Sequence, residues 1–535
     1  MQGGLRRIVA AMTTVDASVL ADVLQRVQAR RLIETIVASP RSEQVTIHAP
    51  FTGDELADLP LSTTDDVAAA FDAARTAQVA WAARPVRERA RIIGRIHDLV
   101  LDRQSDLADL VQAETGKARK DAFEEVMDVA LSARYAAARG PKLLRPQRRL
   151  GAIPGLTSAL EVRHPKGVVG VISPWNYPLT LGISDSLPAF VTGNAVVHKP
   201  DTQVALTALR ARAIAVEAGL PEGLWQIVVG DGPTIGGAVI DHADYVSFTG
   251  STAVGRLVGK QTGERLVGAS LELGGKNAMI VLDDADLSRA TEGAVRACFS
   301  NAGQLCIAME RVYVDEKIKD EFVARFVERI NKLRLGASLD YTIDVGTLVS
   351  KAQLDKVTAH VEDAAAKGAR IITGGKPRPD LGPYFFEPTL LEGVEPGMLA
   401  CEDETFGPVV SIYPVVDDEE AIARANATPY GLNGSVWTGD IRRGVAVAKR
   451  LKAGAINVNE GYGAAWGSHD LPSGGMGASG LGRRHGAEGI LRYTEPQAIA
   501  VQRVMGIRPV GNMSYDTFAK VMTGSLRALK RLRRP

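Results

Sequence analysis

Residues 167–173 read GVVGVIS and residues 193–199 read GNAVVHK, and these two stretches decide the fold class. Each is a short run rich in residues that favour β-strands. A segment with helical spacing, TQVALTALRARAIAVEAG, follows at residues 202–219, and two further strand-like runs occur at residues 225–230 and 245–250. Short strands that alternate with longer helical segments predict a parallel sheet built from βαβ units, so the predicted fold class is α/β.

The pattern extends to both sides of this region. Residues 62–85, STTDDVAAAFDAARTAQVAWAARP, begin with Ser/Thr and acidic residues and stop at proline, which predicts a helix in a mainly helical first third. Residues 150–167 form a short strand-like passage with turn residues. A second alternation runs from KNAMIVL at residues 276–282 to GAINVN at residues 454–459 and predicts a second α/β domain.

Length and composition are those of a globular protein with more than one domain. The chain has 535 residues, too many for one core, so we expect two or three domains. It is 45% hydrophobic and 23% charged with a net charge of +1, which argues against disorder and against a nucleic-acid-binding surface. Three cysteines, an odd number, do not form a disulfide framework. They indicate a reducing compartment, and we expect a cytoplasmic protein with no nucleic-acid partner.

Neither a secretory signal nor a stable membrane span is predicted. The N-terminus has two arginines followed by too few apolar residues for a signal core, and Met1 and Met12 both fit as the first residue. Residues 167–197 carry a single charged residue, Asp185, but three prolines and a Trp-Asn-Tyr turn would interrupt a helix in lipid. We interpret this stretch as buried strand, turn and helix.

Residues 511–535 form a basic C-terminal tail. Its apolar residues recur at helical spacing among six basic residues and one aspartate, which predicts a basic amphipathic helix. Contact with a membrane surface is compatible with this pattern, but a solvated or subunit-docking end is the favoured interpretation. The apolar set is Phe518, Val521, Met522, Leu526, Leu529 and Leu532, and the basic set is Lys520, Arg527, Lys530, Arg531, Arg533 and Arg534.

Cys306 lies in NAGQLCIAME, residues 301–310, and its sequence neighbours differ in kind from those of Cys298. Cys298 is flanked by alanine and phenylalanine and has the surroundings of a small core residue. The residues before Leu305 are small, polar and turn-forming, which favours a loop that presents the thiol to a ligand.

Several elements indicate a dinucleotide site at the carboxyl ends of the predicted strands. GDGPTIGG at residues 230–237 misses the dinucleotide fingerprint by one residue and is weak evidence. Gly250 and Ser251 enter a helix whose free N–H groups suit a pyrophosphate, although such a turn, taken alone, is more often a plain connection. Lys199 ends a buried strand at the cleft edge where ligands bind in parallel sheets. The neutral side chain of Thr202 leaves room for a 2′-phosphate.

Two polar residues are candidates to assist a reactive group. Glu272, in LELGGKN, lies at a strand end, where a buried carboxylate with a raised pKa would suit a general base. Asn176, in SPWNYP, is a neutral double donor between two prolines and suits a developing oxyanion. A lone residue of either type is more often structural. The eight histidines show no metal-ligand spacing, so no metal site is predicted.

Nine segments, taken in order between residues 48 and 507, resemble the aldehyde dehydrogenase superfamily. They are SPWNYP, HKPDT, GLPEGLWQIVVG, FTGSTAVG, LELGGKN, FSNAGQLCIAMER, EDETFGPVVS, INVN and PSGGMGASGLGRRHG. The resemblance implies that Cys306 is the nucleophile, Glu272 the general base, and Asn176 the oxyanion donor together with the backbone N–H of Cys306. The cofactor positions that it implies are Trp175, Asn176, Lys199, Pro200, Asp201, Thr202, Gly250, Ser251, Leu273, Glu404 and Phe406.

The resemblance also implies the architecture. A Rossmann-type parallel-sheet cofactor domain would comprise residues 1–148 and 168–281, and an α/β catalytic domain residues 282–486. A small β oligomerisation flap would comprise residues 149–167 and 487–510. The unpaired strand edges of such a flap need a partner, so we expect a homodimer or a homotetramer.

The implied reaction is the oxidation of an aldehyde to a free carboxylic acid through a thiohemiacetal and a thioester on Cys306, with NADP or NAD as cofactor. Coenzyme-A-acylating relatives lack the glutamate of this segment, so Glu272 favours the free acid as product. NAD-selective relatives usually carry glutamate where this chain has Thr202, so we expect NADP to be used at least as well as NAD.

Within the superfamily the chain most resembles bacterial, in particular actinobacterial, succinate-semialdehyde dehydrogenases of the NADP type, which implies succinate semialdehyde as substrate. Members of that group carry an arginine eight residues after the oxyanion asparagine, where this chain has Ser184. Arg483 and Arg484 are candidates to replace that cation. A longer aliphatic or an aromatic aldehyde is the alternative, because three predicted pocket residues are apolar: Leu305, Ile307 and Trp466.

Two other classes of protein compete with this interpretation. Cys306, Glu272 and Asn176 would also serve a cysteine hydrolase of thioesters or esters, but the cofactor segments weigh against it. A non-catalytic binding protein on this fold would be expected to lose at least one of these three residues, and none is lost.

Overall fold

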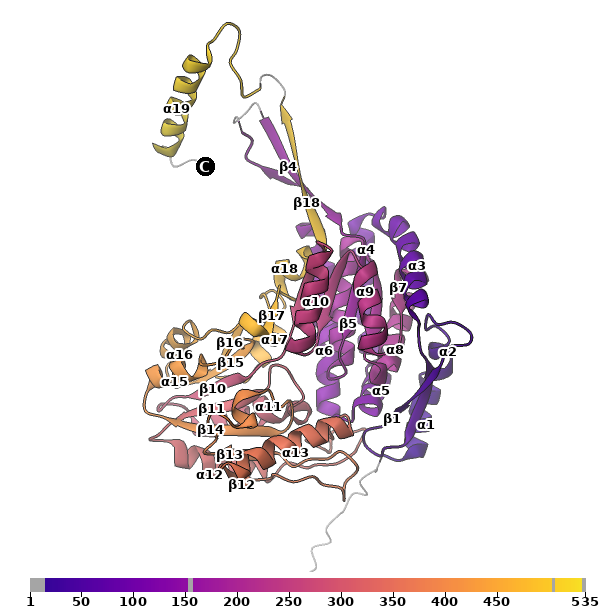
Figure 1. Cartoon of the computed structure of the whole chain (residues 1–535), viewed down its shortest axis with the longest axis vertical. Helices are drawn as coiled ribbons and strands as arrows, with labels where there is room; N and C mark the ends of the chain where they lie inside the picture. Colours follow the sequence, from indigo (N-terminus) through magenta and orange to yellow (C-terminus); the bar gives the residue numbers. More distant parts are fainter. Residues whose placement is uncertain (1–14, 153–156, 503–505, 532–535) are drawn as a thin grey trace, which may run out of the picture. The chain divides into compact units, whose positions relative to one another are not determined.

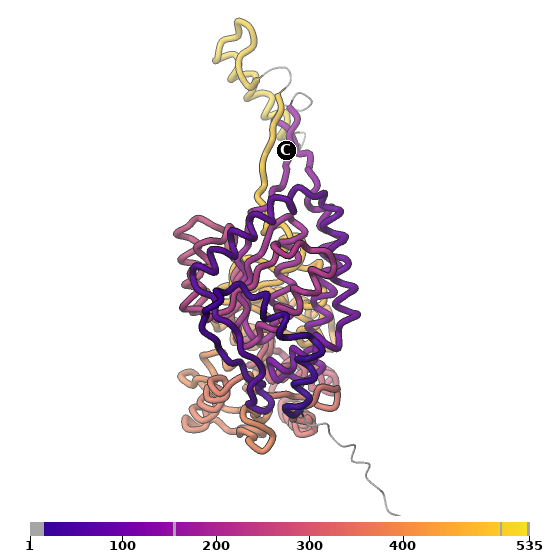
Figure 2. Tube along the Cα trace, turned by 90° about the vertical axis from the view of Figure 1, so that its right-hand side faces the viewer, coloured from indigo at the N-terminus to yellow at the C-terminus, as the bar shows by residue number. Residues whose placement is uncertain are grey.

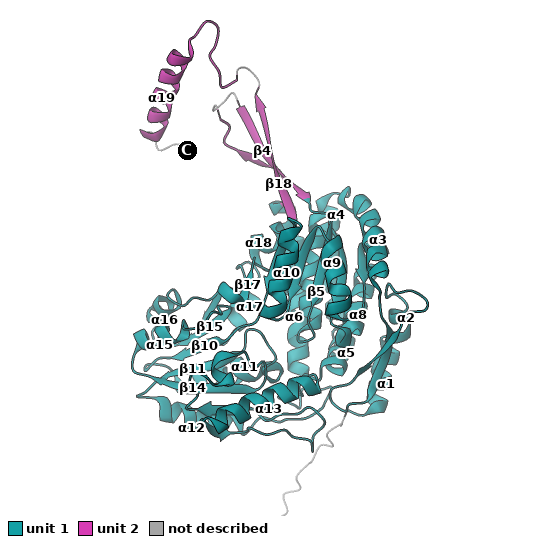
Figure 3. Cartoon of the chain, in the orientation of Figure 1, with its two compact units in different colours: residues 1–143, 165–493 teal, residues 144–164, 494–535 magenta. Residues whose placement is uncertain are grey.

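The computed structural model of the protein describes residues 15–152, 157–502 and 506–531. The chain divides into two compact units (Figure 3): unit 1 is Met1–Leu143 with Pro165–Tyr493, and unit 2 is Leu144–His164 with Thr494–Pro535. Met1 and Met12, like Leu532, Arg533 and Arg534 of the predicted basic helix, lie outside the described residues.

Unit 1 contains a six-stranded sheet with the order β17-β9-β8-β5-β6-β7. Its strands run parallel except β17, which is antiparallel to β9. The strands are β5 (Val168–Ser173), β6 (Ala195–Pro200), β7 (Trp225–Ile227), β8 (Tyr245–Thr249), β9 (Gly268–Glu272) and β17 (Gly480–Leu481). Their valines, among them Val168 and Val196, are fully buried because helices cover both faces of the sheet. The predicted α/β class and the parallel sheet are confirmed.

Strand order in this sheet reverses between β5 and β8, which puts helices on both faces. The crossover helices α7 and α8 lie on one face and α9 and α10 on the other, where Figure 1 shows them in front of the strands. Their bounds are α7 (Pro178–Thr192), α8 (Ala205–Glu217), α9 (Gly237–His242) and α10 (Thr252–Glu264).

The first third of the chain is mainly helical, as predicted, and packs against this sheet and its helices. Figure 2 shows these indigo and purple segments across the side of unit 1 that faces the viewer. Thr63 caps α3, because its hydroxyl accepts from the backbone N–H of Asp66 while the Asp66 carboxylate accepts from that of Thr63. The elements are α1 (Ala17–Arg26), α2 (Ala29–Ile33), β1 (Gln44–His48), β2 (Glu55–Pro60), α3 (Thr64–Ala82), α4 (Val86–Asp102), α5 (Gln104–Thr115) and α6 (Arg119–Leu143).

A seven-stranded sheet forms the rest of unit 1, with the order β12-β13-β14-β11-β10-β15-β16. Alternation along β10 sends Ala278 and Ile280 into one apolar core and Met279 and Val281 into another, so both faces are buried. The strands are β10 (Asn277–Val281), β11 (Met309–Asp315), β12 (Arg370–Thr373), β13 (Thr389–Glu392), β14 (Val409–Val415), β15 (Asn433–Trp437) and β16 (Ala455–Val458). The helices are α11 (Leu287–Phe299), α12 (Lys319–Ile330), α13 (Lys351–Ala366), α14 (Leu399–Glu402), α15 (Asp418–Ala425), α16 (Ile441–Ala448), α17 (Gly463–Gly467) and α18 (Gly486–Leu491).

Unit 2 is a three-stranded sheet with the order β18-β4-β3, followed by the helix α19. Glu161 of the central strand forms ion pairs with Arg149 and Arg163. The predicted amphipathic helix is present, and none of its residues is buried. Its elements are β3 (Gln147–Arg149), β4 (Thr157–Pro165), β18 (Thr494–Gln502) and α19 (Tyr515–Arg531). Among the helices that the structure describes, we find none with the length and apolar character needed to cross a membrane.

Candidate functional site

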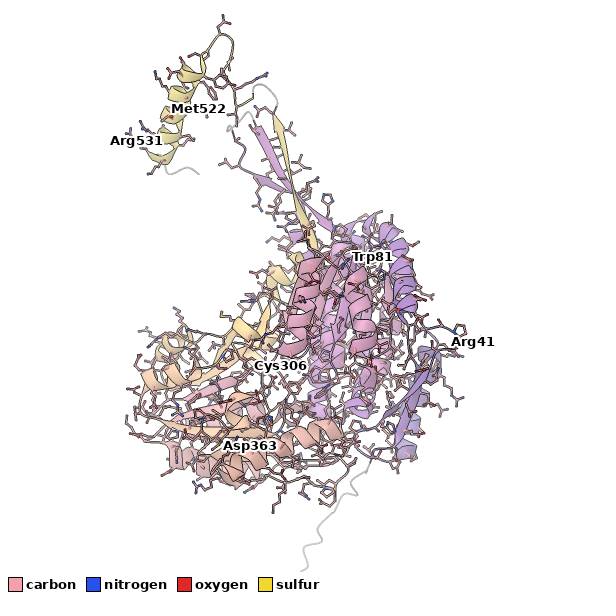
Figure 4. The ribbon with its side chains drawn as sticks, viewed as in Figure 1. Arg41, Trp81, Cys306, Asp363, Met522 and Arg531 are labelled. Carbon is pink, nitrogen blue, oxygen red and sulfur yellow. The ribbon has the colours of Figure 1, made fainter. Side chains whose placement is uncertain are left out.

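Two cavities of unit 1 meet at Cys306, which Figure 4 labels. The first, called here the edge cleft, is lined by residues that follow the carboxyl ends of β5, β6, β8 and β9, where ligands bind in doubly wound sheets. The second, the inner cavity, is lined by residues of α7, of the loop around Cys306 and of the segment from Ala455 to His485. Both cavities share five lining residues: Asn176, Thr249, Glu272, Leu273 and Cys306.

Most of the predicted cofactor residues line the edge cleft. Pro200 and Thr202 are not among its lining residues, and Thr202 begins a short helical turn after β6. The predicted residues that do line the cleft are Trp175, Asn176, Lys199, Asp201, Gly250, Ser251, Leu273, Glu404 and Phe406.

The inner cavity receives three of the four predicted substrate-pocket residues: Leu305, Ile307 and Trp466. The fourth, Ser184, is not among its lining residues. Ser184 is buried in α7, and its hydroxyl donates to Oδ2 of Asp128 at 2.7 Å. Of the two arginines considered as replacements for the missing cation, Arg484 lines the cavity and Arg483 does not.

Asp128 and His469 lie close to His485, a lining residue of the inner cavity. The atoms of these three residues that could bind a metal lie within 4.8 Å of one another. The two imidazole rings stack with centroids 4.2 Å apart and planes inclined by 24°, so their in-plane lone pairs do not converge on one point. A metal ion needs such convergence. His469 instead lies 3.3 Å from Asp128, and although burial raises the pKa of Asp128, its bond to His469 brings it down to about 2.

The loop before Cys306 is strained and is held by side-chain amides. Asn301 and the residue after it have φ of 51° and 52°, the left-handed region that non-glycine residues rarely adopt. The Asn301 amide donates to the carbonyls of Asn176 and Gln304, each at 3.0 Å. The Asn277 amide, at the start of β10, donates to the Cys306 carbonyl at 2.7 Å. Asn301 and Asn277 lie in segments whose sequence indicates only polar turns. The carbonyls to which their amides donate could therefore not be predicted.

The Cys306 thiol is protonated at neutral pH in this arrangement. Burial, together with the negative charges of Glu404 and Glu272, raises the pKa of Cys306 to about 12, against the lowering influence of the Arg484 charge and of a backbone hydrogen bond. A thiolate therefore requires a base or an added positive charge nearby.

Glu272 ends β9 and lines both cavities. Its Oε1 is buried and has no hydrogen-bond partner among the described residues. Burial raises the pKa of Glu272 to about 8, against the lowering influence of Arg484 and Arg492. A carboxyl group with this pKa exchanges protons close to neutral pH, as a general base must.

Asn176 follows β5 and is held by its backbone, which leaves its side chain at the cavities. Lys117 is fully buried and donates to the Asn176 carbonyl at 2.6 Å and to Glu125 at 2.6 Å. The other oxygen of Glu125 accepts from two N–H groups in the first turn of α7. The Asn176 amide nitrogen donates to the Gln304 carbonyl at 3.2 Å and has a second N–H. No sequence pattern indicates Lys117 or Glu125, because charged residues in a helical region are usually solvated.

The edge cleft has groups that fit a dinucleotide. Lys199 is nearly buried, and its ammonium makes a single hydrogen bond, to the Pro200 carbonyl at 3.3 Å, so two N–H groups are left for a ligand. Ser251 caps the 13-residue helix α10, whose first free N–H groups suit a phosphate.

Glu404, Trp175 and Phe406 supply further groups to the lining of the edge cleft. Glu404 accepts from the Gly275 N–H at 2.8 Å, and a Cβ at Gly274 would lie 2.3 Å from its other oxygen, so a side chain at Gly274 would displace the Glu404 carboxylate. The Trp175 and Phe406 rings meet edge to face with centroids 5.6 Å apart. These features suit the flat rings and hydroxyl groups of a dinucleotide.

Comparison with known proteins agrees with this geometry. Residues 36–499 match the sequence profile of the Aldehyde dehydrogenase family. The chain is 53% identical over 486 residues to the "Putative succinate-semialdehyde dehydrogenase (NADP+)" of Mycolicibacterium smegmatis, which covers 91% of this chain and 94% of that protein. It is 34% identical over 458 residues to the "Succinate-semialdehyde dehydrogenase (NADP+) GabD" of Escherichia coli, covering 85% and 93%.

Among solved structures, the betaine aldehyde dehydrogenase of Staphylococcus aureus in complex with NAD+ is similar, with a TM-score of 0.85 at 30% identity. The match covers 93% of this chain and 99% of that one. The fold is therefore shared with a solved aldehyde dehydrogenase.

Proposed function

Because this chain belongs to the aldehyde dehydrogenase family, we propose that it oxidises succinate semialdehyde to succinate with NADP, through a covalent intermediate on Cys306. The observation that carries the proposal is the meeting of the edge cleft and the inner cavity at Cys306, Glu272 and Asn176. The names of the relatives in M. smegmatis and E. coli support the substrate and the cofactor.

The first half of the reaction is thiolate addition. The Cys306 thiol gives up its proton to water, and the sulfur attacks the aldehyde carbon to form a thiohemiacetal alkoxide. The Asn176 side-chain amide and the backbone N–H of Cys306 donate to that alkoxide. When bound in the edge cleft, the dinucleotide supplies the acceptor for the hydride that leaves the same carbon. The carbon is thereby oxidised to a thioester on Cys306.

The second half of the reaction is hydrolysis. Glu272 takes a proton from a water molecule, and the oxygen attacks the thioester carbon. The carbon–sulfur bond breaks, the acid leaves, and Cys306 is regenerated as a thiolate. Leu273, next to Glu272, and the apolar walls of the inner cavity limit the number of water molecules at this carbon.

The cofactor would be held by groups on both walls of the edge cleft. We assign Lys199 to the adenosine ribose and its 2′-phosphate, Gly250 and Ser251 to the pyrophosphate, and Glu404 to the nicotinamide ribose. Thr202, which follows Lys199 in the chain outside the lining, is assigned to the same 2′-phosphate. In this assignment residues 1–148 and 168–281 form the cofactor domain and residues 282–486 the catalytic domain.

Spectroscopy at 340 nm tests the proposal directly. With succinic semialdehyde and NADP, we expect reduced nucleotide to form in amounts equal to the acid produced. We also expect kcat/KM for NADP to equal or exceed that for NAD, because no carboxylate at position 202 repels the 2′-phosphate. Hydrolysis of a thioester without nucleotide reduction would identify a hydrolase instead. A strong NAD preference would contradict the cofactor assignment, and faster oxidation of an aromatic aldehyde would contradict the substrate.

Replacing Asn176 with alanine is expected to lower kcat by about 10² to 10³, because one of two donors to the alkoxide is lost. Steady-state kinetics with saturating NADP would measure this, and the KM for NADP should stay within about threefold if the pyrophosphate contacts dominate binding. Asn512→Ala, at an exposed position of unit 2, is the matched control. An unchanged kcat in Asn176→Ala would remove this residue from the mechanism.

We also propose a cytoplasmic homo-oligomer assembled through unit 2. Its strand β18 lies at a sheet edge, and eight of its nine residues are exposed, including Ile499 and Val501. Exposed apolar strand edges are usually paired in the native assembly. All three cysteines are free, in accord with a reducing compartment. Light scattering that gives the mass of a single chain would contradict the assembly.

A further inference from the structure

The inner cavity has one cationic side chain in its lining, Arg484. The two carboxylates of that lining, Glu124 and Glu272, differ in their surroundings. Glu124 is paired with Arg296 at 2.9 Å and accepts from the Tyr462 hydroxyl. Glu272 has the raised pKa described above. The charge left for a ligand in this cavity is therefore that of a guanidinium.

Arg484 is fixed by its Nε and keeps its two terminal NH2 groups without acceptors. Its Nε donates to Asp185 at 2.9 Å, and its side chain is only 13% exposed. Among the described residues, no acceptor makes a hydrogen bond with Nη1 or Nη2 of Arg484. In the part of the chain that the structure describes, neither nitrogen is among the fully buried atoms without a partner, so both remain open to the inner cavity, where an anionic or polar ligand can accept from them.

Arg492 also binds Asp185, but both of its terminal NH2 groups have hydrogen-bond acceptors. Its Nη2 donates to Asp185 at 2.9 Å and to the Tyr493 hydroxyl at 2.7 Å, and its Nη1 donates to Ser270 at 3.0 Å. Asp185 thus carries one negative charge between two arginines. Asp128 brings a second negative charge close to Arg484, so what distinguishes Arg484 from Arg492 is its place in the lining of the inner cavity.

His485 gives a second, independent sign of a polar ligand at this place. It lines the inner cavity and is 9% exposed, and neither of its ring nitrogens has a hydrogen-bond partner among the described residues. Burial lowers the pKa of His485 to about 3, so the ring is neutral and offers one N–H donor. His485 lies next to Arg484 in the chain and in the lining of the inner cavity, which places its one N–H donor beside the two NH2 groups of Arg484.

We propose that Arg484, assisted by His485, binds the distal carboxylate of a short oxo acid whose aldehyde carbon lies at Cys306. This inference rests on the proposed function and names the group that selects the substrate class. A carboxylate matches the two parallel N–H groups of a guanidinium fork. The oxo acid must be short, because Arg484 and Cys306 line the same inner cavity.

The test compares two aldehydes with four carbons each, succinic semialdehyde and butanal, in which a methyl group replaces the carboxylate. We expect Arg484→Gln to lower the ratio of their kcat/KM values by about 10- to 100-fold, the range for a charged hydrogen bond. The ratio cancels any loss common to both substrates through Cys306 or Glu272. An unchanged ratio in Arg484→Gln would overturn the proposal.

Arg483→Gln is the matched control, because Arg483 donates to the carbonyls of Gly475 and Gly482 and does not line the cavity. It should leave the ratio unchanged, and a ratio that falls as far as in Arg484→Gln would overturn the assignment. Arg484→Lys keeps the charge but not the fork, and should give an intermediate ratio.

Binding can be measured without turnover. In the unmodified protein, succinate should protect Cys306 from alkylation by iodoacetamide, followed on the Cys306 peptide by mass spectrometry, and butyrate should protect far less. Equal protection by both acids would overturn the proposal even if Arg484→Gln fails to fold. Oxidation of butanal as efficient as that of succinic semialdehyde would refute this inference alone, whereas no oxidation of any aldehyde would refute the proposed function.

Discussion

Cys306→Ser is expected to lower kcat for aldehyde oxidation by about 10⁴ or more, the scale on which loss of a covalent nucleophile acts. A serine hydroxyl has a much higher pKa than a thiol and is a weaker nucleophile toward the aldehyde carbon. The residue would still fill the same volume, because the Cys306 loop is held through its backbone carbonyl by Asn277 and through the turn by Asn301. Rates of NADP reduction over the first turnover would measure the effect.

Two control measurements accompany the Cys306→Ser experiment. Cys401→Ser, which changes a half-buried free thiol outside both cavities, should retain normal rates. NADP binding to Cys306→Ser, measured by calorimetry, should persist, because the edge cleft keeps its other lining groups. A Cys306→Ser variant with more than about one hundredth of the normal kcat would refute the covalent mechanism.

Glu272→Gln is expected to uncouple the two halves of the reaction. The first turnover should still release about one equivalent of reduced nucleotide per site, followed by a steady state lowered by about 10² to 10⁴, because water is no longer activated. Rapid mixing would show the burst, and mass spectrometry of the quenched protein would find the acyl group on the Cys306 peptide. Glu488→Gln, at an exposed position of α18, should give the same burst and the same steady-state rate as the unchanged protein.

The same residue predicts the pH dependence. Hydrolysis needs deprotonated Glu272, and since burial raises its pKa to about 8, kcat should increase between pH 6 and pH 9 and then level off. In Glu272→Gln this dependence should vanish from the steady state. A wild-type kcat that is flat across this range, with hydrolysis limiting, would show that another group accepts the proton.

The sequence was a better guide to the sheets and helices than to the hydrogen bonds and ion pairs that hold the site residues in place. The β-rich runs around Val168 and Ala195 were sufficient to predict a parallel sheet, because valine-rich strands alternating with helices have few other arrangements. Asn176, Glu272 and Cys306 are far apart in the chain, yet the structure brings them to one place, because the ends of β5 and β9 lie at the same sheet edge and the Cys306 loop meets them. Their chemical roles stay predictions until tested.

Long-range partners account for what the sequence missed. Ser184 was expected in the substrate pocket, but its one hydroxyl donates to Asp128 on α6, and no pattern on α7 indicates that partner. Lys117 was not singled out, although it is fully buried against Glu125 and the Asn176 carbonyl. Such pairings depend on how helices dock and not on local periodicity.

The small overlap between the two cavities has a consequence for how this protein can diversify. Leu305, Ile307 and Trp466 line the inner cavity and not the edge cleft, while Lys199 and Ser251 line the edge cleft and not the inner cavity. Substitutions in one set leave the other set's lining residues unchanged. Selection or design can therefore change which aldehyde the protein accepts nearly independently of which dinucleotide it accepts. Cys306 stays the same in both cases.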